Sequence, residues 1–103
     1  MEEHGHNDIV YLMHPSIIKL ARYDVAHKTN LRDLLFYYLL CGCSLNRTAS
    51  LMYMHRNTVM NKLNKINEII GIPLDDGFVR HRLIISCLVY RYYSDYMHMT
   101  IQL

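Results

Sequence analysis

A row of asparagines marks the stretch HRNTVMNKLNKINEII at residues 55–70, in which Asn recurs at positions 57, 61, 64 and 67. Asn is a poor helix former, because its side chain competes for nearby backbone groups. Its amide can pair bidentately with N6 and N7 of adenine in the major groove, while Lys and Arg bind phosphates or guanine. The residue types in this stretch are therefore suited to contacts with nucleic acid.

On a helical wheel, this stretch separates into an apolar side and a polar side. The apolar side predicts a core stripe: Val59, Leu63, Ile66 and Ile70. The polar side faces the other way: Asn57, Asn61, Asn64 and Glu68, flanked by Thr58 and Lys65. The alternative interpretation is an ordinary solvated face, but Lys, Glu and Gln would form one with better helix propensity.

Basic charge is concentrated in the same part of the chain. The formal net charge is +2, which is too small to indicate a nucleic-acid partner by itself. Between residues 44 and 70, however, the only acidic side chain is Glu68, and it stands against Arg47, Arg56, Lys62 and Lys65. The basic excess therefore coincides with the asparagine row.

The length of 103 residues suits one domain. Helix starts are predicted at Pro15, at Thr29-Asn30 with a capping box to Asp33, at Ser44 or Asn46, and at Asp75-Asp76. Helix ends are predicted at Gly42 and at Gly71, which Pro73 follows. The result is an all-α fold of about five helices, at 15–26, 30–40, 45–52, 56–70 and from 77 into the Tyr-rich tail. We expect the domain at 14–96, after a partly ordered segment 1–13 and before a tail 97–103.

The expected helices at 45–52 and 56–70 have helix-turn-helix spacing. We predict that Ala49 and Leu51 face inward and that Leu51 locks against Val59 and Leu63, while Val25 completes the inward stripe of the first helix. In a helix-turn-helix, the amino end of the second helix meets base edges and the first helix crosses the DNA backbone.

Several motifs carry a likeness to a known family: HPSIIKLARYD (14–24), Thr29 with Leu31 and Leu35, TASLMYMHRNT (48–58), Leu63 with Ile66, and GIPLDD (71–76). With them, residues 14–93 resemble the C-terminal helix-turn-helix domain of PucR-type transcriptional regulators, bacterial proteins related to regulators of purine catabolism and sugar-diacid use. The resemblance implies a sequence-specific DNA-binding domain, commonly fused after a sensory region. It also implies that residues 55–58 open the recognition helix. This chain departs from the family at Asn61 and Lys62, where relatives commonly have an aromatic residue followed by Arg, so an operator inferred from relatives does not transfer.

The combined interpretation is duplex DNA binding by the helix at 56–70. We predict that Arg56, Asn57 and Asn61 reach base edges. Four further side chains are predicted to position the helix on phosphates: Arg47, Thr58, Lys62 and Lys65. His55 is predicted to cap the helix or to contact the backbone at its start. The competing function is a protein-interaction or dimerisation module, derived from a helix-turn-helix, with weak or no DNA binding.

Other chemistry has less support in the sequence. One residue separates His4 from His6 and Cys41 from Cys43, whereas zinc ligand pairs usually have two to four residues between them. There is no Gly-rich phosphate loop and no nucleophile with a relay, so we expect no enzyme activity, metal or cofactor. The three cysteines lie among apolar residues and no signal peptide is visible, which favours a cytoplasmic protein with reduced thiols. No apolar run approaches the ~18 residues that would span a membrane.

The C-terminal helix is apolar on nearly all sides over Leu83–Val89, and tyrosines follow it at 90, 92, 93 and 96, around Arg91. This pattern predicts a self-association surface formed with the helix at 30–40. Plain core packing and stacking on single-stranded bases are the two alternatives. A two-fold dimer would place two recognition helices about one DNA turn apart.

Overall fold

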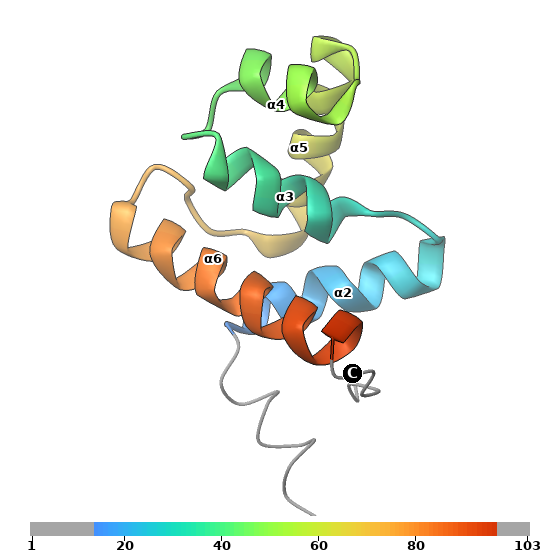
Figure 1. The fold of residues 1–103 in the computed structure, drawn as a ribbon, viewed down its shortest axis with the longest axis vertical. Coiled ribbons are helices and arrows are strands. Elements are labelled where there is room, and N and C mark those ends of the chain that lie inside the picture. The colour runs from blue at the N-terminus through green and yellow to red at the C-terminus, as the bar shows by residue number, and fades with distance from the viewer. Residues whose placement is uncertain (1–13, 97–103) are drawn as a thin grey trace, which may run out of the picture.

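All secondary structure within residues 14–96, the part of the chain that the computed structural model describes, is helical. Figure 1 shows the elements: α2 (Pro15–His27), α3 (Leu31–Leu40), α4 (Leu45–Met52), α5 (Arg56–Ile70), α6 (Gly77–Arg91) and the short π-helix η2 (Tyr92–Tyr96). The predicted all-α class is confirmed. The segments expected at 1–13 and 97–103 lie outside the described residues.

Local signals set most helix ends where the sequence predicts them. α2 begins after His14, whose Nδ1 accepts a hydrogen bond from the backbone N–H of Ser16 at 3.1 Å. α5 ends at Gly71, whose φ of 65° is a left-handed conformation that favours a residue without Cβ. α6 begins after Asp76, whose carboxylate accepts hydrogen bonds from two backbone N–H groups of the first turn.

The start of α3 differs from the predicted capping box. Asn30 occupies the N-cap position, but its side chain makes no capping hydrogen bond. The carboxylate of Asp24, in α2, caps the helix instead, since it accepts hydrogen bonds from the backbone N–H groups of Leu31 at 2.8 Å and Arg32 at 3.0 Å. The Asp24 carboxylate also accepts a hydrogen bond from the hydroxyl of Thr29 at 2.5 Å. The prediction was wrong because the α2–α3 turn brings a carboxylate of the preceding helix to these N–H groups.

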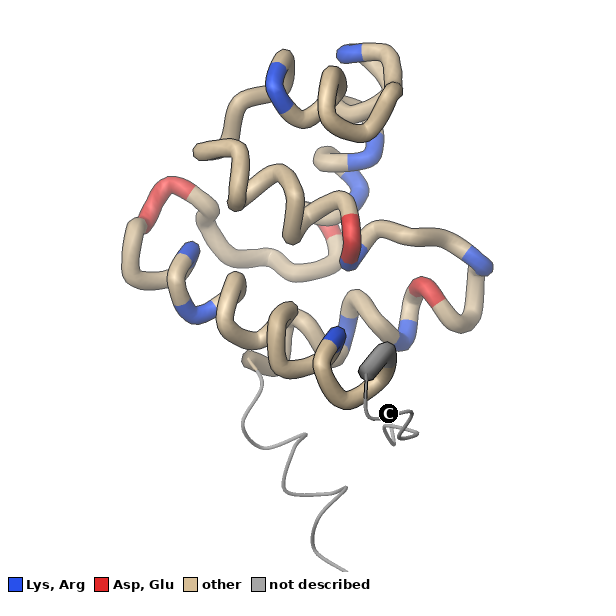
Figure 2. Tube along the Cα trace, viewed as in Figure 1, with Lys and Arg blue, Asp and Glu red and all other residues tan. Residues whose placement is uncertain are grey.

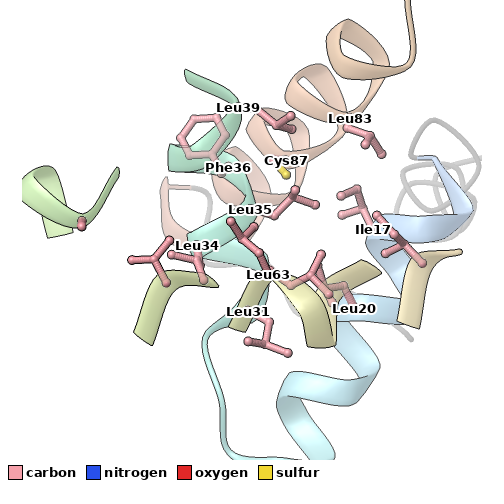
Figure 3. Packing of buried hydrophobic residues seen from close by; sticks show 14 residues of the cluster. Ile17, Leu20, Leu31, Leu34, Leu35, Phe36, Leu39, Leu63, Leu83 and Cys87 are labelled. Carbon is pink, nitrogen blue, oxygen red and sulfur yellow. The ribbon is translucent and has the colours of Figure 1, made fainter. Parts of the chain in front are cut away.

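One hydrophobic core joins the helices, and Figure 3 shows how it packs. Its buried members come from each α-helix of the described chain: Ile17 and Leu20 of α2; Leu31, Leu34, Leu35, Phe36 and Leu39 of α3; Ala49 of α4; Val59, Leu63, Ile66 and Ile70 of α5; Leu83 and Cys87 of α6. α3 lies at the centre, since it packs against α2, α4, α5 and α6. The predicted core stripe of α5 is confirmed.

Two side chains predicted to face the core are exposed. Val25 is 69% exposed, because the buried residues of α2 all lie within its first two turns, at 16–21. Leu51 is 52% exposed, because Thr48 and Ala49 form the buried face of α4. Leu51 therefore does not lock α4 against α5.

The helix-turn-helix pair occupies one end of the molecule. In Figure 1, α4 and the start of α5 project above α3, whereas α2 and α6 lie below it. α2 packs against α5 as well as α3, so α5 is held from two sides. Within residues 14–96, no helix combines the length and the apolar character that crossing a membrane requires.

We expect the Asp24→Ala substitution to lower the free energy of unfolding by about 1–3 kcal/mol, because it leaves two backbone N–H groups of α3 without their charged acceptor. Asp24→Asn keeps one acceptor oxygen and should cost less. Urea unfolding followed by circular dichroism measures both changes.

Asp33→Ala is the matched control for this prediction, because the capping box would require Asp33, whereas in the structure its carboxylate lies 3.7 Å from the guanidinium of Arg32. A larger loss for Asp33→Ala than for Asp24→Ala would show that the capping box, and not Asp24, stabilises the start of α3.

Candidate nucleic-acid interface

A tight turn joins α4 to α5 and sets the direction of α5. The N-cap of α4 is Ser44, whose hydroxyl oxygen accepts a hydrogen bond from the backbone N–H of Arg47 at 3.2 Å. α4 ends at Tyr53, which has a φ of 55°, and the N–H of Met54 then bonds back to the carbonyl of Ala49 at 2.9 Å. The bond from Met54 satisfies a carbonyl group at the end of α4, as is common in helices that end at a residue in the left-handed conformation.

The face of α5 opposite the core stripe carries Asn57, Asn61 and Asn64, and Asn67 lies nearer the stripe. The stripe residues Val59 and Ile66 are fully buried, and the side chains at 57, 61, 64 and 67 are all exposed. The wheel prediction that the asparagines point outward is therefore confirmed. Because four buried apolar side chains hold α5, its outer face is free to carry residues with poor helix propensity.

The residues predicted to contact DNA are distributed over both helices of the motif. Arg47 lies exposed on α4, and five others lie exposed on α5: Arg56, Asn57, Thr58, Asn61 and Lys65. Lys62 is half-buried. Figure 2 shows that Lys and Arg occur along α4 and α5, at the end of the molecule that these helices form. Among the described residues, no carboxylate pairs with Arg47, Arg56 or Lys62.

Lys65 differs from the other basic residues because it has partners within the chain. Its Nζ lies 3.0 Å from Oε1 of Glu68 and 5.5 Å from the centre of the Tyr23 ring in α2. The hydrogen bond that Lys65 donates to the Glu68 carboxylate, together with the charge of that carboxylate, raises the pKa of the Lys65 ammonium group. Part of its charge is therefore already balanced locally, unlike that of Arg47 or Arg56.

His55 stands at the N-cap position of α5 in an extended conformation, with φ −67° and ψ 143°. Its side chain is exposed and makes no capping hydrogen bond, so the predicted cap is not formed. The imidazole remains outside the first turn and does not fold back onto its N–H groups. The first turn of α5 thus presents donors that no side chain of the N-cap satisfies.

Tyr53 is an exposed residue that the sequence interpretation did not assign to the site. It is 96% exposed in the turn between α4 and α5. With Cys41, Arg47, Ser50 and Leu51 it lines a shallow hollow of about 460 Å³. The sequence indicated a break at this position, because the helical pattern is interrupted before His55. The exposure of Tyr53 depends on the left-handed turn, which the sequence pattern does not show.

The other candidate sites of the sequence do not assemble in the described residues. Within 14–96, no group of three His, Cys, Asp or Glu side chains is placed to hold a metal ion. Burial raises the pKa of the Cys87 thiol to about 12, so this cysteine is a neutral core thiol at neutral pH. His4 and His6 lie outside the described residues.

The short α4, the left-handed turn and the exposed polar face of α5 define a helix-turn-helix domain of the kind that binds DNA in transcription regulators. Residues 31–89 match the PucR C-terminal helix-turn-helix domain. Since this match covers more than half of the 103 residues, the chain belongs to that family of transcription regulators.

The chain is also similar to the purine catabolism regulatory protein of Bacillus subtilis (strain 168), with 37% identity over 57 residues. The aligned part is 55% of this chain and 11% of that relative, so the chain spans about a tenth of the length of the regulator it matches. No solved structure matches the chain.

The family match includes the two motifs TASLMYMHRNT and GIPLDD but begins at residue 31. The stretch HPSIIKLARYD, in α2, lies before it. In the structure α2 nevertheless contributes Ile17 and Leu20 to the core and Asp24 to the start of α3. The structural unit around the interface is therefore longer than the matched region.

Proposed function

We propose that α5 enters the major groove of duplex DNA and reads a specific site, and that the chain regulates bacterial transcription in the cytoplasm through this contact. The observation that carries the proposal is the exposed asparagine-rich face of α5, which lies opposite a fully buried stripe at the end of the molecule formed with α4. Arg56, Asn57 and Asn61 contact base edges, since Arg suits guanine and Asn suits adenine.

The phosphate contacts come from both helices of the motif. Arg47 of α4 and Thr58 and Lys62 of α5 bind the DNA backbone on either side of the groove. The first turn of α5 adds uncapped backbone N–H groups, which suit a phosphate, and the exposed His55 lies beside them. Lys65 contributes less, because it must exchange Glu68 for a phosphate.

The chain acts as a dimer through α3 and α6. Four large apolar side chains of this region are half or more exposed: Leu40, Ile85, Leu88 and Tyr92. Leu88 and Tyr92 also line a hollow of about 420 Å³ with Phe36 and Tyr37. A second copy would remove this surface from water, and two copies related by a two-fold axis would match a palindromic site.

Stacking of single-stranded bases has weaker support at the same surface. The Arg91 guanidinium donates to the Tyr37 hydroxyl at 3.1 Å and lies 5.0 Å from the centre of the Phe36 ring. Arg91 is thus used within the chain, where it joins the end of α6 to α3. This arrangement fits a packed protein surface better than a nucleotide-binding platform.

We expect binding to a mixed pool of short duplexes, measured by fluorescence anisotropy across a salt series, to weaken strongly as salt rises. If ~4 phosphates are contacted, log affinity should fall with log salt at a slope of roughly −3.6, because counterions are released. Sequencing the retained duplexes should give an enriched palindrome. Absence of binding at low salt would instead favour the protein-interaction module.

We expect Asn57→Ala to weaken binding to the selected site by about 1–3 kcal/mol and to leave binding to random duplexes nearly unchanged, because a base contact is sequence-specific. Asn67→Ala is the matched control: it makes the same change on α5, but Asn67 lies in the last turn and lines a hollow with Ile72 and Leu74. Equal losses on both kinds of DNA would assign Asn57 to positioning.

We expect sedimentation at tens of micromolar concentration to show a dimer that the Leu88→Glu variant converts to a monomer, because a carboxylate would be buried in the apolar interface. Val25→Glu, at a more exposed apolar position on α2, is the control and should remain dimeric. If the wild-type protein remained a monomer well above micromolar concentration, the dimer proposal would be wrong, and the protein would bind DNA as a monomer.

A further inference from the structure

Met60 is an apolar side chain of α5 that lies at the edge of its polar face, between the core stripe and Asn64. The other apolar residues of α5 are accounted for by the core: Val59, Leu63, Ile66 and Ile70 are buried in it, and Ile69 packs against it. Met60 is 37% exposed and is neither a member of the core cluster nor one of the half-buried residues packed against it. More than a third of this apolar side chain is therefore left in water in the free protein.

Two neighbours of Met60 on the helix surface are residues proposed to meet DNA. Arg56 and Asn57 lie one turn before it and Asn64 one turn after it, so they share its side of the helix. All of these side chains are exposed. Long side chains in helices point toward the amino end, which directs the Met60 thioether toward Arg56 and Asn57. This is the end of α5 that would enter the groove.

Helix propensity does not explain the methionine, because Lys and Gln form helices about as well and are better solvated. The side chain differs from them in being apolar, unbranched and polarisable, so it adapts to an apolar group of irregular shape. Among the groups by which base pairs are distinguished in the major groove, the 5-methyl of thymine is the apolar one, whereas the others are hydrogen-bond donors or acceptors.

We propose that Met60 packs against a thymine methyl and that α5 thereby selects A·T base pairs within its site. The inference rests on the proposed function of α5 as a major-groove reader. One surface would then make two kinds of contact with the same base pair. The asparagine amides suit N6 and N7 of adenine, and the methionine side chain suits the methyl group of the thymine paired with that adenine. Both select the same base pair, on the same face of the same helix.

The test replaces each thymine of the selected duplex, one at a time, by deoxyuridine, which pairs identically but lacks the methyl. Wild-type protein should lose about three- to fourfold in affinity at one position per half-site, the loss that corresponds to one desolvated methyl group. Met60→Ala should bind the unmodified duplex more weakly by a similar or larger factor, and its affinity should not fall further at that position. Met60→Leu should regain part of the sensitivity.

Asn57→Ala is the control variant, because it removes a neighbouring hydrogen-bonding group and should remain sensitive to deoxyuridine. Sensitivity lost equally in both variants would mean that the methyl effect follows the general fit of α5, and it would overturn the assignment to Met60. Equal affinity for every deoxyuridine duplex would overturn it as well.

Failure of the inference and failure of the proposed function give different results. If Met60 does not read thymine, the salt slope and the enriched site persist while deoxyuridine has no effect. If α5 does not read DNA, no duplex is retained at low salt and no site is selected, which overturns both.

Discussion

The burial of α3 is the constraint on which the rest of the structure depends. This helix packs against α2, α4, α5 and α6, and its residues Leu34 and Leu35 are almost completely removed from water. Its first turn is fixed from outside by the carboxylate of Asp24. Because α4 and α5 both rest on α3, the angle at which the helix-turn-helix is presented follows from this packing and not from the motif alone.

The two sides of α5 show how a helix can be stable and still carry an unfavourable surface. An Asn costs at most ~0.7 kcal/mol of helix propensity relative to Ala. A buried Val, Leu or Ile side chain contributes about 1.5–3 kcal/mol. Four buried side chains of this kind, from Val59 to Ile70, therefore outweigh four asparagines. The outer face can then be chosen for its contacts, which in the proposal are base edges and phosphates.

Family membership and structure describe units of different length. The family match begins at the first residue of α3, yet α2 closes one side of the core and packs against α5. Tyr23 of α2 lies against Lys65 of α5, so the two helices also meet at the protein surface. α2 therefore helps to position α5 and its exposed polar face.

Sequence alone determined the helical class, the helix ends and the outward direction of the asparagine row. It did so because caps such as Ser44 and Asp76 and the stop at Gly71 act on neighbouring residues, and because the wheel of α5 has one clear apolar side. Only the tertiary structure decided that Leu51 is exposed and that Asp24 caps α3. Both facts depend on which helix lies opposite each side chain. The packing of helices that are distant in the sequence decides this, whereas the local sequence pattern does not.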